Sequence, residues 1–247
     1  ATVGDDGELQ QVLKDMDRFA AGLDAEAHRY WQLHRRRFAW VASFVAERAK
    51  RNSELRVLDV GNSFQTVLLS KAFRSARVDT LGFFDHRFPA GQDSTHYEMD
   101  LNDCYQEERW PEAREGGYDL IAFLEVIEHL YTSPLQVLSC LKRMLRPGGE
   151  ILVQTPNAAA LKKRLRLLSG KNPYELIRTD RANPGHFREY TVADLKRYAK
   201  LTGLTVAETR MDSYLVDGKR FDRACDRLSR ALPGSLKCGI SMALRAD

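Results

Sequence analysis

The sequence predicts an α/β fold, a mostly parallel sheet with helices on both faces, preceded by a helical extension. Three observations support this prediction. From residue 55 onward, short runs of strand-forming residues alternate with helical stretches, the pattern of parallel α/β proteins. Residues 8–50 instead place apolar residues at helical spacing. Hydrophobic residues make up 43% of the 247 residues, which is enough for a sizeable core.

The elements follow in chain order. In the N-terminal extension (residues 8–50), we expect aromatic residues such as Trp31 and Phe38 to be core contacts. The expected strands are residues 56–60, 78–84, 96–99, 120–124, 150–154, 205–210 and 239–243, with helices at 66–73 and 135–145 among them. Two segments extend this pattern, at 158–191 and 217–237. The second has Phe221, Cys225 and Leu228 at helical spacing and is expected to pack its apolar side on the domain, or less readily on a partner or membrane.

No repeat or low-complexity linker interrupts the chain, so we expect a single domain over residues 1–247, with a core at 54–157 and a final helix and strands at 192–247. Four cysteines lie far apart without a metal-binding spacing, which indicates reduced thiols and a cytoplasmic protein. No apolar run approaches the roughly 18 residues of a membrane span, and no secretory signal is evident.

Positive charge is concentrated in one segment. Residues 161–181 contain seven Lys or Arg and two acidic residues, and this excess is larger than the net charge of +4 for the whole chain. The cluster is either a solvated helix face or a surface for phosphate or anionic lipid.

Acidic residues follow the first three expected strands. Asp59 and Gly61 close the first strand, Asp85 follows the second and Asp100 the third. An acid within a strand, a glycine at the turn and then a helix form the opening of a nucleotide-binding βα unit. A carboxylate at the second strand suits a vicinal diol because it can accept two hydrogen bonds.

Two carboxylates and an imidazole follow the fourth strand. Glu125 comes at the end of the strand, and Glu128 and His129 follow on the next turn. Open α/β sheets bind ligands at this carboxyl edge. The other interpretation is an ordinary polar helix start, since Glu is favourable in a first helical turn.

These segments, followed by the Pro147-Gly148-Gly149 turn before the fifth strand, resemble the class I S-adenosylmethionine-dependent methyltransferases in their order. The resemblance implies a Rossmann-like seven-stranded sheet of order 3-2-1-4-5-7-6, with residues 54–157 binding the cofactor and residues 158–191 covering the acceptor. The glycine motif is incomplete, because Ser63 and Gln65 replace its later glycines. Asn62 tolerates a left-handed backbone better than most residues and could keep the turn in altered form.

The resemblance also implies which residues contact S-adenosylmethionine. They are Asp59, Gly61, Asn62, Ser63, Asp85, Asp100, Leu101 and Leu124. Arg37, on the N-terminal extension, resembles an arginine that contacts the cofactor carboxylate in ubiquinone-pathway enzymes.

Glu125, Glu128 and His129, together with Thr155-Pro156-Asn157 and His186, resemble the group of ubiquinone-pathway and bacterial glycan or small-molecule O-methyltransferases. This resemblance implies methyl transfer to a hydroxyl of a small-molecule, glycan or lipid-linked acceptor, with Glu125, Glu128, His129 and His186 as the catalytic candidates. The basic insertion favours an anionic acceptor.

The same four side chains match a quartet that binds a divalent cation in RNA terminal 2′-O-methyltransferases. Carboxylates and imidazoles are adequate ligands for Mg²⁺, Mn²⁺ or Zn²⁺. Without a metal, His129 could act as a general base or cap a helix.

Two further hypotheses remain. An RNA-terminal methyltransferase is supported by the quartet and the basic insertion, but Ala158, Ala159 and Ala160 replace acidic and aromatic residues of that family. A non-catalytic methyltransferase fold that only binds a partner is motivated by the missing glycines. Asn172-Pro173-Tyr174 resembles an amine-methylating motif, but it lies after the fifth strand rather than the fourth, so it is interpreted as a loop.

Overall fold

The computed structural model describes residues 6–52, 54–73, 76–113, 117–180, 184–214 and 220–247. The chain divides into two compact units. The first unit is Ala1–Asp100 with Arg114–Ala122, and the second is Leu101–Ala113 with Phe123–Asp247. The single-domain organisation stays a prediction. Among the described residues, no helix is both long and apolar enough to cross a membrane.

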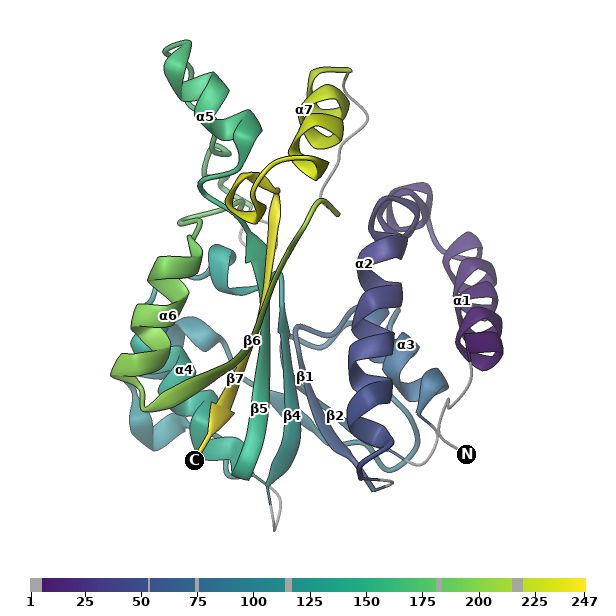
Figure 1. Cartoon of the computed structure of the whole chain (residues 1–247). Helices are drawn as coiled ribbons and strands as arrows, with labels where there is room; N and C mark the ends of the chain where they lie inside the picture. The colour runs from purple at the N-terminus through teal and green to yellow at the C-terminus, as the bar shows by residue number, and fades with distance from the viewer. Residues whose placement is uncertain (1–5, 53, 74–75, 114–116, 181–183, 215–219) are drawn as a thin grey trace. The chain divides into compact units, whose positions relative to one another are not determined.

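Seven strands form one mixed sheet of order β3-β2-β1-β4-β5-β7-β6, which confirms the predicted topology (Figure 1). Strand β1 pairs in parallel with β2, and β2 with β3. Strand β7 runs antiparallel to both β5 and β6. The strands are β1 (Arg56–Val60), β2 (Arg77–Gly82), β3 (His96–Glu98), β4 (Tyr118–Leu124), β5 (Leu145–Pro156), β6 (Leu204–Asp212) and β7 (Gly239–Ala246).

Strand β5 departs from the prediction at its start. It begins at Leu145, so the predicted turn at Pro147-Gly148-Gly149 lies inside the strand. Gly148 accommodates this with a φ of 76°, a conformation that glycine adopts without steric cost. The sequence signal for a turn therefore marks a local irregularity in an extended segment.

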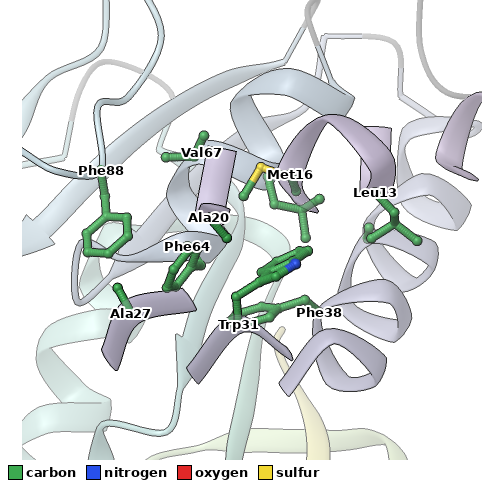
Figure 2. Close-up of a cluster of buried hydrophobic side chains, with 11 residues drawn as sticks. Leu13, Met16, Ala20, Ala27, Trp31, Phe38, Phe64, Val67 and Phe88 are labelled. Carbon is green, nitrogen blue, oxygen red and sulfur yellow. The ribbon is translucent and has the colours of Figure 1, made fainter. Parts of the chain in front are cut away.

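The core of the first unit is aromatic and joins α1 (Asp6–Ala21), α2 (Ala25–Ala49) and α3 (Phe64–Ala72). Figure 2 shows Trp31, Phe38 and Phe64 among aliphatic side chains from these helices, with Phe88 at the edge of the cluster. The indole N–H of buried Trp31 donates to Asp17 Oδ1 at 2.8 Å, so its polar atom is also satisfied. The prediction that Trp31 and Phe38 are core contacts is confirmed.

In the second unit, α4 (Pro134–Met144) and α6 (Val192–Leu201) pack against each other and against β5 and β6, respectively (Figure 1). Ser133 and Thr191 cap these helices through side-chain oxygens, and Pro134 occupies the first turn, where its missing N–H costs nothing. Short 3₁₀ turns complete the chain: η1 (Leu101–Tyr105), η2 (Glu107–Arg109), η3 (Ile127–His129) and η4 (Gly234–Leu236).

Two helices, α5 (Leu161–Leu168) and α7 (Arg220–Arg230), lie beyond the ends of β5 and β7 (Figure 1). The buried carboxylate of Asp222 on α7 lies within 4 Å of both Lys162 and Arg166 on α5. The expectation that α7 packs its apolar side on the domain is wrong for Phe221 and Leu228, which are exposed. Cys225, the third residue of that side, is buried. The ionic contact to α5 keeps Asp222 on the inward side of α7, and Phe221 and Leu228 face outward.

Candidate functional site

The turn after β1 lies in the first unit and is built around Gly61. Gly61 takes a φ of 85°, and its N–H donates to Leu81 O on β2 at 2.9 Å. Ser63 caps α3, with its hydroxyl accepting from Gln65 N and its own N–H donating to Thr66 Oγ1. Ser63, at the first missing glycine, is therefore the N-cap of α3, a position where serine is favoured, and Gln65 lies in the first turn of this helix.

Asn62 joins this turn to the loop after β2. Its buried side-chain amide donates to Phe88 O at 2.8 Å, and its Oδ1 accepts from Asp85 N at 2.9 Å. Among the described residues, positive φ values outside glycine occur at Asp93 and Glu125, so the expected left-handed backbone at Asn62 is not adopted. Gly61 supplies that conformation, and the Asn62 side chain fixes the position of Asp85 instead.

Asp59 and Arg37 approach each other in the interior of the first unit. Burial raises the pKa of Asp59 to about 7, opposed by the hydrogen bond from Thr66 Oγ1 at 2.5 Å and by the positive charge of Arg37. Arg37 is buried on α2, stacks on the Phe38 ring and donates to the Tyr30 hydroxyl at 3.1 Å. Two residues expected to bind cofactor are thus close together, although they are far apart in the sequence.

Asp85 already has a cationic partner. The guanidinium of Arg87 donates to both of its carboxylate oxygens, with Nη2 to Oδ2 at 2.8 Å, and also reaches Asp24 at 3.2 Å. The Arg87 hydrogen bonds hold the pKa of Asp85 below its usual range, so the carboxylate is ionised at neutral pH. A carboxylate has about four acceptor sites, so a diol could still share Asp85 with Arg87.

The remaining cofactor candidates fall in different units. Asp100 is half-buried at the end of the first unit, whereas Leu101 and Leu124 are buried in the second. Beside Leu101, Asn102 accepts from Tyr131 N at 2.8 Å and from Thr132 N at 3.3 Å. No sequence pattern pointed to this role of Asn102, because its partners lie about thirty positions away in the chain.

In the second unit, Glu128, His129 and His186 converge. One ligand atom from each lies within 4.8 Å of the others, so the three side chains could hold a metal ion. Glu125, the fourth member of the predicted quartet, is not in this group. It takes a φ of 55°, and its Oε1 lies 3.4 Å from the hydroxyl of Tyr214. The structure therefore assembles three of the four predicted side chains.

Both imidazoles have a defined donor atom. His129 Nδ1 lies 2.8 Å from Gly185 O, and because a carbonyl oxygen only accepts, this nitrogen carries the proton. His186 Nδ1 lies 3.1 Å from Glu189 Oε1, which fixes the same tautomer. In both rings, Nε2 then keeps its lone pair.

Burial keeps both rings neutral. It lowers the pKa of His129 and, together with the nearby His129, lowers the pKa of His186 to about 4. The two rings lie edge to face, with centroids 4.8 Å apart. A pair of neutral imidazoles, each with an available lone pair, can accept a proton or bind a cation.

Glu128 is fully buried on η3. Thr155 Oγ1 donates to its Oε2 at 3.0 Å, and its backbone carbonyl accepts from Phe187 N at 2.9 Å. The second bond ties the segment that carries His186 to the turn that carries Glu128 and His129. The convergence of the three side chains thus rests on backbone contacts as well as on side chains.

Glu189 and Lys163 form a layer behind His186 that the sequence analysis did not identify. The Lys163 ammonium forms an ion pair with Glu189 Oε2, while Glu189 Oε1 accepts from His186. Lys163 is only 6% exposed, and burial lowers its pKa to about 8. Lys163 was counted with a surface charge cluster, because a sequence count of charges carries no information about burial.

The three side chains could hold a divalent cation if they moved closer together. Metal–ligand bonds of about 2.1 Å at tetrahedral angles place two ligand atoms about 3.4 Å apart, so atoms up to 4.8 Å apart would have to approach by as much as about 1.4 Å. Two neutral imidazoles and one carboxylate suit Zn²⁺ or Mn²⁺ better than Mg²⁺, which prefers oxygen ligands.

Comparisons with known proteins agree with this fold. Residues 30–209 match a protein family described as a methyltransferase domain. A probable S-adenosylmethionine-dependent methyltransferase of Mycolicibacterium smegmatis is 34% identical over 95 residues, 38% of this chain and 32% of the relative. The chain thus spans about a third of that relative's length. A ubiquinone biosynthesis O-methyltransferase of Burkholderia vietnamiensis is 26% identical over 213 residues, 79% of this chain and 86% of the relative.

Solved structures show the same fold at low identity. Magnesium protoporphyrin IX methyltransferase of Synechocystis, with bound S-adenosylhomocysteine, has a TM-score of 0.56 at 15% identity, covering 94% of both chains. N-methyltransferase NodS of Bradyrhizobium japonicum, with the same ligand, has a TM-score of 0.51 at 12% identity, covering 98% of this chain and 99% of the other.

Proposed function

The chain belongs to the methyltransferase-domain family and is an S-adenosylmethionine-dependent methyltransferase, and we propose that its acceptor group is a hydroxyl of a small molecule, glycan or lipid-linked molecule. The observation that carries the proposal is the convergence of Glu128, His129 and His186. The similarity to a ubiquinone biosynthesis O-methyltransferase over most of the chain supports the same acceptor chemistry. The non-catalytic hypothesis is set aside.

A hydroxyl is a weak nucleophile until it loses its proton, so an O-methyltransferase gains from a base held next to the acceptor. His129 and His186 are neutral and each keeps a lone pair on Nε2, the state in which an imidazole accepts a proton. In this proposal His129 removes the proton and Glu128, with Thr155 on its carboxylate, stabilises the imidazolium that results. Glu125 remains an acceptor-side candidate.

For the cofactor, we propose the first-unit residues Asp59, Gly61, Asn62, Ser63, Asp85, Asp100 and Arg37. Leu101 and Leu124, which belong to the second unit, stay predictions from the resemblance. When bound, S-adenosylmethionine supplies an electrophilic methyl group on its sulfonium. The chain offers ionised Asp85 for a diol and buried Arg37 for a carboxylate. The backbone conformation of Gly61 lets a ligand approach the turn closely.

A divalent cation held by Glu128, His129 and His186 is the second route to the same product. It would lower the pKa of a bound hydroxyl and orient it, so no side chain would need to act as the base. The two routes differ in whether a metal-free preparation retains activity. Location in the cytoplasm remains a prediction, and the four free cysteines support it.

The proposal is tested in two steps. Isothermal titration with S-adenosylmethionine is expected to show binding that Asp85→Asn weakens and His129→Ala leaves unchanged. Labelled cofactor is then incubated with hydroxyl-bearing sugars, phenols and lipid-linked glycans, and the products are analysed by mass spectrometry. Methyl transfer to oxygen that His129→Ala reduces at least about hundredfold supports the proposal. Transfer only to amine nitrogen would contradict it.

Chelation separates the two routes. If activity survives exhaustive chelation and Zn²⁺ or Mn²⁺ leaves the melting temperature unchanged, the base route holds. Loss of activity that Mn²⁺ restores, together with a metal-dependent melting temperature that His129→Ala abolishes, supports the metal route. For the RNA hypothesis, acceptor binding should weaken steeply with salt, and a neutral sugar should show little dependence.

A further inference from the structure

Helix α5 turns charged side chains toward the protein and leucines toward water. Lys163 is buried, and Lys162 and Arg166 face Asp222 of α7. Leu165 and Leu168 lie on the other side of the helix and are exposed, Leu168 to 84%. An ordinary surface helix turns its apolar side to the protein and its charges to water. Packing within the protein therefore does not explain why these leucines face the solvent.

Helix α7 shows the same inversion. Asp222, Cys225 and Ser229 are buried, and Ser229 shares a hydrogen bond of 3.0 Å with Ser213. Phe221 and Leu228, seven positions apart and so on one face, are 46% and 55% exposed. Two neighbouring helices with apolar outer sides are unlike the scattered single leucines that are normal on a surface.

The segment after α5 adds two more exposed apolar residues, Leu176 at 83% and Ile177 at 60%. It is anchored near the start of α5, because the Tyr174 ring lies 5.7 Å from Lys163 Nζ and the Tyr174 hydroxyl reaches Ala158 O at 3.4 Å. All three segments belong to the second unit, and α5 contacts α7. We call this set the apolar rim: Leu165, Leu167, Leu168, Leu176, Ile177, Phe221 and Leu228.

The segments that carry the apolar rim also carry exposed cations. The exposed basic side chains in these segments are Arg164, Lys171, Arg178, Arg220, Arg223 and Arg227. Glu175 and Asp180 are the exposed acidic side chains described in the same segments. Protruding leucines mixed with arginines complement a surface that is apolar below and anionic above, as an anionic lipid bilayer is. A nucleic acid would account for the cations, but it has no apolar region that exposed leucines could enter.

We propose that the apolar rim and its cations dock the enzyme on the surface of an anionic lipid bilayer. The leucines enter the boundary between headgroups and acyl chains, and the arginines lie at the level of the lipid phosphates. The segment of the apolar rim that carries Leu176 lies beside the catalytic candidates, because Arg178 N donates to Pro184 O at 2.8 Å and the next carbonyl, Gly185 O, accepts from His129. The inference does not depend on which acceptor is methylated. It would place the active site next to membrane-bound molecules.

Flotation of the full chain with lipid vesicles tests the proposal. We expect retention on vesicles that contain phosphatidylglycerol beside phosphatidylcholine, little on phosphatidylcholine alone, and weaker retention as salt increases. Leu168→Ser with Leu176→Ser should weaken binding at least about tenfold. The matched control is Leu201→Ser, a change at an exposed leucine on α6, which should bind like the wild type. Arg164→Glu with Arg178→Glu should also weaken binding, and Lys196→Glu with Lys200→Glu on α6 should weaken it less.

Several outcomes would overturn the proposal. The first is that the protein floats with neither vesicle type, and the second is that it binds both types equally. The third is that the arginine variants lose vesicle binding while the leucine variants keep it in full. Self-association in light scattering that the leucine changes abolish, without vesicle binding, would assign the apolar rim to a second copy of the chain. Circular dichroism melting of each variant checks that lost binding is not lost folding.

Discussion

His186 Nδ1 lies 3.1 Å from Oε1 of Glu189, the same carboxylate that pairs through its other oxygen with the buried Lys163. This contact decides which nitrogen of His186 carries the proton. With Nδ1 protonated, Nε2 keeps the lone pair that either a base or a metal ligand needs. Glu189 is therefore a positioning residue for His186, and its effect on the ring can be measured without knowing the acceptor.

Replacing Glu189 should change the tautomer of His186. Long-range ¹H–¹⁵N NMR of the wild type near neutral pH should show His129 and His186 as neutral rings with the proton on Nδ1. In Glu189→Ala the His186 signal should shift to a mixture of tautomers, because the acceptor is gone. Glu189→Gln should largely restore the wild-type pattern, since its amide oxygen also accepts.

The assignment comes from the signal that disappears in His186→Gln, and Glu108→Gln, at an exposed glutamate on η2, is the control. An unchanged His186 spectrum in Glu189→Ala would show that Glu189 does not set the tautomer. If the metal route holds, the same Ala variant should bind Mn²⁺ about ten- to hundredfold more weakly.

Asn62→Ala should lower both stability and cofactor affinity. The change removes two hydrogen bonds that join the turn after β1 to the loop that carries Asp85, and it leaves the N–H of Asp85 and the carbonyl of Phe88 without these partners. A loss of about 2 kcal/mol in the free energy of unfolding is expected, read from urea denaturation. Gln92→Ala, at an exposed residue of the following loop, should cost little, and equal losses in the two variants would contradict the bridging role.

The sequence predicted the framework well because strand residues are a local signal. The prediction for β1 coincides with Arg56–Val60, and the order of all seven strands followed from the resemblance. Glu128 and His129 could be placed together because they adjoin in the chain. The resemblance also brought His186 to them, although it lies far away in sequence.

The parts that sequence could not supply depend on burial and distant partners. Lys163 is one of seven basic residues in a run, and only the fold shows that Glu189 draws it inside. The prediction for Asn62 concerned its backbone conformation, whereas its side chain forms the hydrogen bonds to Phe88 and Asp85. In α7 the helical spacing of Phe221 and Leu228 was read correctly, but a spacing pattern does not say which side faces the protein. The contact of Asp222 with α5 determines that.

Gly61→Ala should destabilise the first unit. Gly61 has a φ of 85°, where a Cβ costs roughly 1–2 kcal/mol, so the free energy of unfolding should fall by about that amount. Cofactor binding, measured by calorimetry, should weaken as well if a ligand approaches this turn. The control is Gly91→Ala, because a Cβ there would meet no atom within 4 Å and its φ is not in the left-handed region. A Gly61→Ala protein as stable as the wild type would contradict a strained turn.

Asp59 should make stability depend on pH. Burial raises its pKa to about 7 in the folded protein, from the ordinary aspartate value of 3.8. The folded state therefore holds a proton that the unfolded state releases, and this contribution is fully present below about pH 4 and is lost as the pH rises towards 7. Asp59→Asn has no such titration. The wild type should thus lose stability relative to this variant between these two pH values, by at most about 4 kcal/mol.

Urea denaturation of both proteins across this pH range measures the difference. Thr66→Val provides a directional control, because the Thr66 hydroxyl donates to Asp59 and holds its pKa down. Removing that bond should raise the pKa further, so the loss of stability should continue to higher pH than in the wild type. Parallel curves for the wild type and Asp59→Asn would instead mean that Asp59 is ionised in the folded protein throughout, with the positive charge of Arg37 outweighing the effect of burial.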